Sequence, residues 1–308
     1  MKKFSFTKNV KYCLLISAVI ILAGIVGLCT MGVNWGIDFT GGTIVTLDME
    51  QEYDVADVQN ALKALDLGDA PVSKSGDGDV KTLAVVRFKT SPGDVDEGVG
   101  QALQDALKDK YPNVRMDSME EVGAVMGQEL QMNALMSVGI ACILILIYIA
   151  FRFEVYSAIV AVLALVHDVL IMFTFVVLLQ VQVNTSFVAA MLTIVGYSIN
   201  ATIVVFDRIR ENVHKMPSRE FTRGQIVDTS IRETLTRSIN TTLTTFIMIF
   251  LVYIMGVDSI KEFTLPIIVG LISGAFSSVF LAAPTWWLIS GRDTPKKVKI
   301  HRRKNKWA

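Results

Sequence analysis

The sequence predicts a polytopic α-helical membrane protein, with six transmembrane helices and a small extracytoplasmic α+β domain between the first two. Of its 308 residues, 52% are hydrophobic and only 19% are charged, whereas charged residues make up about 25% of ordinary soluble domains. Long apolar segments alternate with polar ones, and one polar stretch is much longer than the others. A soluble core does not need so much apolar surface, so a lipid bilayer is the expected environment.

The apolar segments are long enough to cross a bilayer, which takes about 20 residues. The first follows a basic start, as a secretory signal does, but it is longer than the apolar core of such a signal, which has about 7–15 residues. We therefore expect an uncleaved span. The six expected spans are Tyr12–Met31, Met132–Ala150, Ser157–Leu179, Phe187–Phe206, Ile239–Met255 and Leu265–Leu288.

Lysine and arginine indicate which ends of the spans face the cytoplasm. They gather before the first span, after the fourth and after the sixth, whereas the loops 180–186 and 256–263 together hold only Lys261. Because basic loops remain inside, both termini are expected on the cytoplasmic side of the cytoplasmic (inner) membrane. The expected divisions are 1–31, the N-terminus and first span; 32–131, the outer domain; 132–290, spans two to six; and 291–308, a basic cytoplasmic tail.

The outer domain is strongly acidic. It has nineteen of the 29 acidic residues but only eight of the 29 basic ones, a net charge of −11. An excess of acidic residues keeps a translocated domain soluble. The alternative is an acidic surface that attracts or repels a client.

Periodicity predicts a β-α-β-α-β order for this domain, with the helices packed on one face of the sheet. The strands are expected at "GTIVTLDM", "KTLAVVRFKT" and "NVRMDSMEEVG". The helices are expected at "DVADVQNALKALD" and "SPGDVDEGVGQALQDALKDKYP". The segment "VSKSGDGD" is interpreted as a mobile loop.

The domain opens on "GIDFTGGT", which contains Gly36, Asp38, Gly41 and Gly42. A glycine-rich run beside a strand can bind phosphate, but no Gly-Lys-Ser/Thr follows and nucleotides are absent outside the cell. We interpret the segment as a structural motif, a tight turn with positive φ at Gly41 or Gly42.

Two ionisable residues, His167 and Asp168, lie about halfway along the third span. An ionised Asp at the centre of a bilayer costs about 3 kcal/mol on insertion scales, so such residues face a bundle interior and mark ion or proton paths. Both are therefore candidate proton sites. The alternative is an interior pair that only bonds to neighbouring Ser, Thr or Asn side chains.

The fourth span is polar on one side. The span carries Tyr197, Ser198, Asn200 and Thr202. At about 100° per residue, one broad face holds Tyr197, Asn200, Ala201, Val204 and Arg208. At its cytoplasmic end, Asp207, Arg208 and Arg210 are interpreted as a charged anchor.

The fifth span begins with Arg237 and continues with Thr242 among several other hydroxyls. Because lipid offers them no partner, we expect these side chains to pair across helices. In the sixth span, Gly270, Gly274 and Ser278 form a strip of small residues that predicts close contact with another helix. The candidate ion pathway comprises His167, Asp168, Tyr197, Ser198, Asn200, Ala201, Arg237 and Thr242.

Enzyme motifs are missing from the sequence. It has no H-E-x-x-H, no G-x-S-x-G and only three His residues. The three cysteines fall in apolar segments, so neither a disulfide nor a zinc site is expected. We expect a non-enzymatic protein with no metal site and no nucleic-acid partner.

In combination, these motifs resemble those of the SecF family. Its members are the smaller subunits of the bacterial SecD–SecF export machinery and are related in architecture to RND transporters. The motifs "GIDFTGGT", "FRFE" at 151–154, "ALVHD", and "GYSIN" followed by "DRIREN" stand in the family's order over nearly the whole chain.

The resemblance implies an RND-like half bundle that SecD completes. It further implies work with the SecYEG channel and SecA on exported unfolded proteins, using an H⁺ or Na⁺ gradient in the late stages of export. The alternative is an RND-type small-solute or lipid transporter half that acts as a homodimer.

Ala201 departs from the family pattern. The family commonly has Asp there, taken to carry the proton, and Arg237 matches an Arg thought to cooperate with it. Alanine cannot titrate, so coupling could have moved to Asp168 or to acidic residues of SecD. The ion could instead be Na⁺, held by oxygens around Ser198, Asn200 and Thr242, or the substitution could be engineered.

Overall fold

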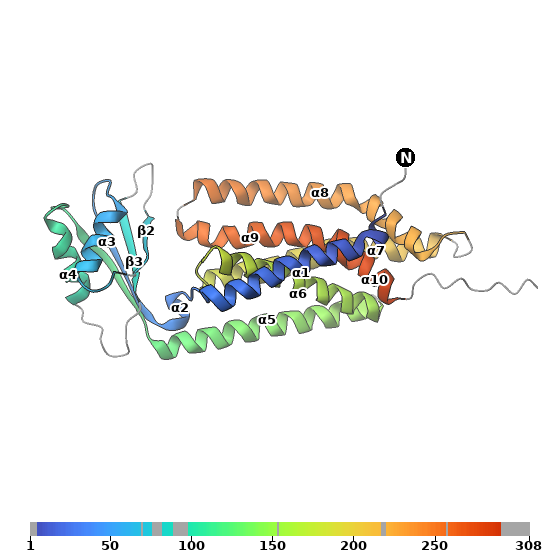
Figure 1. The fold of residues 1–308 in the computed structure, drawn as a ribbon, viewed down its shortest axis with the longest axis horizontal. Helices are drawn as coiled ribbons and strands as arrows, with labels where there is room; N and C mark the ends of the chain where they lie inside the picture. The colour runs from blue at the N-terminus through green and yellow to red at the C-terminus, as the bar shows by residue number, and fades with distance from the viewer. Residues whose placement is uncertain are drawn as a thin grey trace, which may run out of the picture.

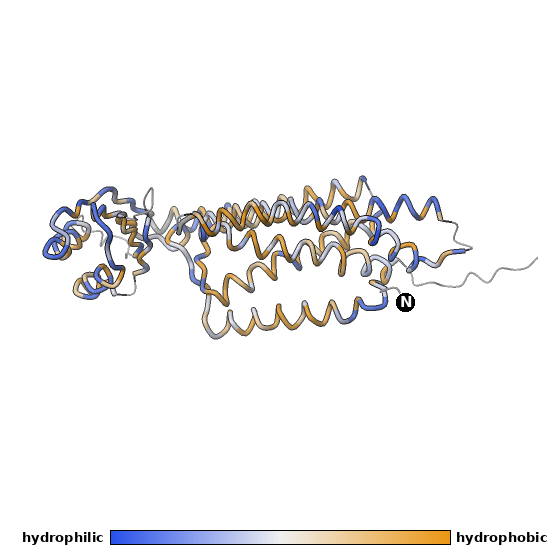
Figure 2. Tube along the Cα trace, turned by 90° about the horizontal axis from the view of Figure 1, so that it is seen from above, coloured by the Kyte–Doolittle hydropathy of each residue, from blue (hydrophilic) through white to orange (hydrophobic). Residues whose placement is uncertain are grey.

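The computed structural model describes residues 5–68, 70–75, 82–88, 98–152, 154–216, 220–256 and 258–290. The molecule is elongated, with a bundle of long helices at one end and the outer α+β domain at the other (Figure 1). Figure 2 shows hydrophobic stretches along the bundle, with hydrophilic ones gathered in the outer domain and at the opposite end. The two parts expected from the sequence are therefore distinct in space.

The bundle is confirmed as six helical stretches long and apolar enough to span a membrane. One of them, α9, passes into a π-helical turn, η1, and then into α10. Helix α5 begins eight residues before the expected start of the second span, and α7 and α8 extend beyond the expected cytoplasmic ends. The elements are α1 (Phe6–Met31), α5 (Ala124–Arg152), α6 (Val155–Leu178), α7 (Thr185–Lys215), α8 (Arg223–Met255), α9 (Asp258–Phe276), η1 (Ser277–Ala282) and α10 (Ala283–Ile289).

Burial divides the helices into a centre and a periphery. Half of the apolar window of α6 and 61% of that of α9 to α10 are buried, against only 6% for α5 and for α8. Helices with so little burial need lipid or another protein beside them. The chain therefore forms a core around α6, α7 and α9 and leaves two helices on its edge.

Close packing of α7 on α9 depends on small residues. A Cβ atom on Gly270 would lie 2.6 Å from Ile194, and one on Gly274 would lie 3.1 Å from Ser198. Without those side chains the two backbones can approach, as the strip of small residues predicted. This approach brings Ser198 of α7 against Gly274 of α9.

The outer domain is a four-stranded antiparallel sheet in the order β2-β3-β1-β4. Its elements are β1 (Gly42–Asp48), α3 (Val55–Ala64), β2 (Val72–Ser75), β3 (Leu83–Phe88), α4 (Gly98–Lys108) and β4 (Arg115–Val122).

The expected strands and helices of this domain are present, but the interpretation of "VSKSGDGD" as a loop was wrong for its first half. Residues 72–75 pair with β3 as the edge strand β2, because ladder bonds can compensate a short polar sequence at a sheet edge. Residues 76–81 and 89–97, which include the start of the second expected helix, lie outside the described residues.

Helix α3 is joined to the turn that follows α4 by an ion pair. Asp57 accepts hydrogen bonds from Lys110 Nζ and from the Tyr111 hydroxyl, each at 2.6 Å. The hydrogen bond from Lys110, and then that from Tyr111, hold the pKa of Asp57 below its ordinary value. The bond with Asp57 raises the pKa of Lys110 in turn.

The "GIDFTGGT" motif is the junction between the outer domain and the bundle. Its short helix α2 (Ile37–Thr40) is followed by Gly41 with φ 76° and Gly42 with φ 152°, so the expected positive φ is confirmed at both glycines. A Cβ on Gly42 would lie 2.5 Å from the Phe88 carbonyl oxygen. The motif thus needs glycine to bring β1 in beside β3.

Two side chains, one from this junction and one from β3, connect the α+β domain to the ends of α7 and α9 that lie beside it. The Asp38 carboxylate accepts hydrogen bonds from the Thr185 backbone N–H at 2.9 Å and its hydroxyl at 2.6 Å, at the start of α7. Gly36 donates its backbone N–H to the Val183 carbonyl oxygen at 2.9 Å. Arg87 of β3 lies 3.9 Å from the Glu262 carboxylate on α9.

Candidate ion-coupling site

The centre of the bundle holds a completely buried carboxylate, that of Asp168 on α6. Its Oδ2 atom accepts hydrogen bonds from the hydroxyls of Ser198 at 2.5 Å and Ser277 at 2.7 Å. Its Oδ1 atom accepts one from Ser273 at 2.7 Å and lies 3.0 Å from His167 Nδ1. These five residues, called the Asp168 cage below, fill the roughly four lone-pair positions that a carboxylate offers.

Four helical elements build the cage. Asp168 comes from α6 and Ser198 from α7, while Ser273 and Ser277, four residues apart, share one side of α9 and η1. One apolar cluster, around Ala161 and Val205, packs toward the end of the bundle that holds the N-terminus of α1, and a second, around Met172 and Ile194, packs toward the end beside the α+β domain. The cage lies between them, so apolar walls separate it from both ends of the bundle.

His167 is the less complete member of the cage. Its side chain is 13% exposed, and its buried Nε2 atom has no hydrogen-bond partner among the described residues. On the neighbouring helix α1, Gly24 faces Thr174 and Gly27 faces Leu178, so α1 and α6 run parallel. His167 lies seven residues before Thr174 on α6, and residue 17 lies seven residues before Gly24 on α1. The same register therefore places residue 17 of α1 at the level of His167.

The other candidate residues line a separate pocket between α7 and α8, with a volume of about 210 Å³. Arg237 and Asn200 are exposed there, and Ala201 contributes no polar group. Among the described residues, no carboxylate pairs with Arg237. The pocket is lined by Tyr197, Asn200, Ala201, Val204, Arg237, Ser238, Thr241, Thr242, Thr244 and Thr245. We call this surface the α7–α8 polar face.

Three hydroxyls of the polar face, those of Thr241, Thr244 and Thr245, bond within their own helix, contrary to the expected pairing across helices. Thr241 donates to the Arg237 carbonyl oxygen at 2.7 Å, and Thr245 donates to the Thr241 carbonyl oxygen at 3.0 Å. Ser and Thr can bond to a carbonyl one turn earlier, which satisfies them without a partner helix. One bond does cross, from the Tyr197 hydroxyl to Thr245 Oγ1 at 3.3 Å.

The structure thus divides the candidate residues between two places. Ser198 points into the Asp168 cage and is 1% exposed, whereas Asn200 and Thr242 line the polar face. The set proposed for Na⁺, Ser198 with Asn200 and Thr242, therefore does not meet at one point in this conformation. Residues two positions apart on α7 therefore serve opposite surfaces.

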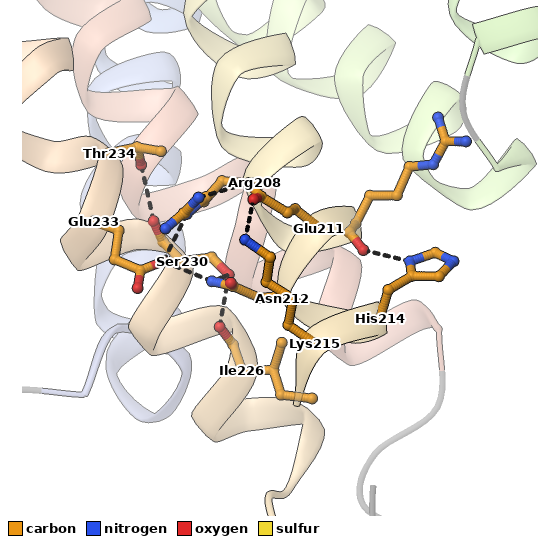
Figure 3. A network of polar contacts seen from close by, with 10 residues as sticks. Arg208, Glu211, Asn212, His214, Lys215, Ile226, Ser230, Glu233 and Thr234 are labelled. Atoms are coloured by element: carbon orange, nitrogen blue, oxygen red, sulfur yellow. Dashed lines mark hydrogen bonds and ion pairs between the residues drawn. The ribbon is translucent and has the colours of Figure 1, made fainter. Parts of the chain in front are cut away.

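The C-terminal end of α7 is connected to α8 by a network of polar contacts (Figure 3). Arg208 Nε donates to the Glu233 carboxylate at 2.7 Å, and Asn212 Nδ2 donates to the same oxygen at 2.7 Å and to the Ser230 hydroxyl oxygen at 3.0 Å. Asn212 is 3% exposed and Ser230 is fully buried. The contacts fix the pairing of the two helices below the pocket.

The other two residues of the expected anchor reach α5. Asp207 lies 3.8 Å from Arg152, and Arg210 donates to the Arg152 carbonyl oxygen at 3.3 Å. The anchor therefore joins α5, α7 and α8. Its basic residues are also among those from which the orientation of the spans in the membrane was predicted.

Comparison with known proteins identifies the family. Residues 102–292 match the model "Protein export membrane protein SecD/SecF, C-terminal", and residues 26–52, which include the junction motif, match "SecD/SecF GG Motif". The chain belongs to the SecD/SecF family. It is 38% identical to the protein translocase subunit SecF of Acidaminococcus fermentans, over 93% of this chain and 97% of that one.

Some members of the SecD/SecF family are longer proteins that contain a SecF-like part. The chain is 36% identical to the protein translocase subunit SecDF of Bacillus subtilis over 96% of its own length, but it spans only 39% of that protein. The crystal structure of SecDF from Thermus thermophilus, a translocon-associated membrane protein, superimposes with a TM-score of 0.79 at 31% identity. That match covers 94% of this chain and 38% of that one. The match with a solved SecDF supports the fold across bundle and outer domain.

Two members of the cage, Ser273 and Ser277, were missed in the sequence. The signal available was the strip of small residues at Gly270 and Gly274, which predicted close contact of the sixth span but not its polar partner. A hydroxyl beside such a strip lies within reach of the neighbouring helices. A membrane-buried Asp needs hydrogen-bond partners, so the serines beside the strip were candidate partners for Asp168.

Proposed function

We propose that this chain is a SecF-type subunit of the Sec protein translocase, which pairs with SecD and uses an ion gradient to promote late stages of protein export. The α7–α8 polar face carries the proposal. A surface with exposed Arg237 and Asn200 cannot remain against lipid. It therefore requires a partner within the membrane, and family membership makes SecD the best candidate.

The distribution of burial supports the same partner. Helices α5 and α8 are barely buried by the rest of the chain, as expected of half a bundle whose other half is a separate subunit. By the positive-inside rule, both termini lie in the cytoplasm, and the outer domain lies across the cytoplasmic membrane, where exported proteins emerge. SecYEG and SecA are the expected further partners, and H⁺ or Na⁺ the coupling ion.

A connection between the bundle and the outer domain is needed to turn ion movement into work on a client. Helices α7 and α9, which supply the serines of the cage, are the two helices to which the outer domain is bonded through Asp38 and Glu262. Movement of one charge through 100 mV releases about 2.3 kcal/mol. That free energy is enough to rearrange one or two hydrogen bonds at the junction.

An export assay in inverted membrane vesicles tests the function. We expect vesicles containing this chain and SecD to export more preprotein when a proton or a sodium gradient is imposed, each gradient being applied separately. Vesicles with Arg237→Ala should lose this stimulation. No response to either gradient would contradict the proposal, and self-association of the chain without SecD would instead favour a homodimeric transporter.

A further inference from the structure

The Asp168 cage is arranged around a negative charge. Three serine hydroxyls donate to its carboxylate oxygens, and hydrogen bonds donated to a carboxylate favour its charged form. A dry carboxylate is strongly disfavoured unless a positive charge or a proton accompanies it. The cage therefore needs a means of balancing its charge.

The groups that can balance this charge are few. His167 is the basic side chain in contact with Asp168, and α7, α9 and η1 present hydroxyls to it. The titratable Tyr197 of α7 points instead to Thr245 on α8. The charged residues of α7 and α9, such as Asp207 and Glu262, lie at the ends of those helices.

One hydroxyl of the cage lies within hydrogen-bonding distance of a second acceptor. Ser277 Oγ lies 2.7 Å from Asp168 Oδ2 and also 3.3 Å from the carbonyl oxygen of Gly274. If its O–H turns to that carbonyl, a lone pair of the Ser277 oxygen becomes free to accept a hydrogen bond from Asp168. Ser277 is also the first residue of the π-helical turn η1, and such turns are frequent at functional sites.

We propose that Asp168 is a reversible proton-binding site and that Ser277 is the hydroxyl that changes its acceptor when the proton binds. The proton bonds to Oδ2 and converts the carboxylate to a carboxylic acid. The acid O–H donates to Ser277 Oγ, while the Ser277 O–H donates to the Gly274 carbonyl oxygen. Ser198, Ser273 and the Nδ1–H of His167 remain donors, and loss of the proton reverses each change.

The inference deepens the proposed gradient coupling, on which its biological meaning rests. It places the titrating group on α6 in a chain whose position 201 is alanine. The site is closed to the α7–α8 polar face, since Asp168 is 0% exposed and is not among the residues that line that pocket. Proton binding at Asp168 can therefore be measured independently of the partner.

Infrared difference spectroscopy of the full chain in lipid vesicles tests the proposal. We expect acidification to produce a carboxylic-acid carbonyl band that Asp168→Asn abolishes, and to do so equally in sodium chloride and in choline chloride. Ser277→Ala should move the midpoint of the band to higher pH by about one to two pH units, because the anion loses one charge-assisted donor.

Ser278→Ala is the matched control. Ser278 is adjacent and equally buried, but it donates to the Ala275 carbonyl oxygen, so its loss should leave the midpoint unchanged. A band absent from the unsubstituted chain, removed by sodium alone, or shifted equally by both serine variants would overturn the proposal. If Asp168→Asn fails to fold, the proposal is still tested by comparing the band midpoints of Ser277→Ala and Ser278→Ala.

The same variants separate this inference from the proposed function. A titrating Asp168 band together with gradient-driven export that Asp168→Asn does not alter would leave the proton site in place and remove its role in coupling. Loss of export in Asp168→Asn without any band would retain the translocase function and overturn the proton site.

Discussion

Helix α7 carries two polar surfaces, which this chain completes to different extents. Toward α6 and α9, Ser198 joins a buried cage in which every acceptor position of Asp168 is occupied. Toward α8, Asn200 and Arg237 remain exposed beside a pocket of about 210 Å³. The first surface is finished within the chain, and the second needs another protein.

The difference shows why neighbouring polar residues of one membrane helix should not be assigned to one site. Positions 198 and 200 are 200° apart around a helix at about 100° per residue, so they face nearly opposite directions. Only one of those directions is buried by this chain. Substitutions on the closed surface should therefore act on stability, and substitutions on the open surface should act on assembly.

The largest effect is expected from Asp168→Ala. It removes the acceptor of three hydroxyls and of His167, and breaking a buried charged network costs about 3–5 kcal/mol. Thermal unfolding of the purified chain in detergent should show a strongly lowered Tm. Asn200→Ala, on the open face, is the comparison variant and should change stability by no more than about 0.5 kcal/mol. Equal losses in the two variants would contradict the distinction between the surfaces.

The next effect is expected in assembly. Arg237→Ala should weaken association with SecD by about 2–5 kcal/mol, the cost typical of truncating one member of a charge pair at a buried interface. The Tm of the isolated chain should change little, because the side chain is exposed there. Co-purification of SecD from membranes measures the loss.

Lys215→Ala serves as its control. It also removes a positive charge, but from an exposed pair with Glu211 on the same helix, so SecD should be retained. If Arg237→Ala retains SecD equally well, the α7–α8 polar face is not the contact surface.

A smaller effect is expected where the outer domain holds α7. Asp38→Ala removes the acceptor of the Thr185 N–H and hydroxyl, and loss of such a cap costs about 1 kcal/mol. Hydrogen exchange at the start of α7 should accelerate about fivefold. Asp48→Ala removes a similar bond to Glu50 N–H within the outer domain and should leave α7 unchanged. Equal acceleration in both variants would show that Asp38 does not hold this helix.

The sequence predicted the parts of the molecule that depend on composition and local pattern. Six spans follow from apolar runs. The expected helix "DVADVQNALKALD" begins with Asp54, which is the N-cap residue of α3 and accepts a hydrogen bond from Ala56 N–H. Positive φ at Gly41 and Gly42 follows from the crowded turn. These features are set within a few residues of chain, so a single sequence contains them.

The cage could be predicted only in part, because its members meet through packing of helices far apart in the sequence. His167 and Asp168 were recognisable because charge inside a membrane is costly. Ser273 lies 105 residues from its acceptor, and nothing local distinguishes it from Ser278. Edge strand β2 was missed for a related reason. Its sequence has only a weak local preference for β structure, and the strand depends on pairing with β3.

The smallest effect concerns Asp57, whose half-buried carboxylate in the α+β domain provides a reference for the completely buried Asp168. Its pKa is held below the ordinary value of 3.8 by the hydrogen bonds from Lys110 and Tyr111. The pair therefore stabilises the outer domain above about pH 4, and this contribution is lost as the pH falls through the lowered pKa. Asp57→Asn should slightly reduce the hydrogen-exchange protection of α3 and α4 at neutral pH. The unsubstituted chain should lose further protection as the pH falls, whereas Asp57→Asn should not.

A high salt concentration should affect Asp57 and Asp168 differently. At 1 M salt, screening acts over about 3 Å around exposed charges but hardly reaches buried ones. Protection of α3 and α4 should therefore decrease in the unsubstituted chain but not in Asp57→Asn, while the infrared midpoint of Asp168 should stay constant. A salt-dependent Asp168 midpoint would mean that solvent ions enter the cage, and the closed surface of α7 would then be open like the other.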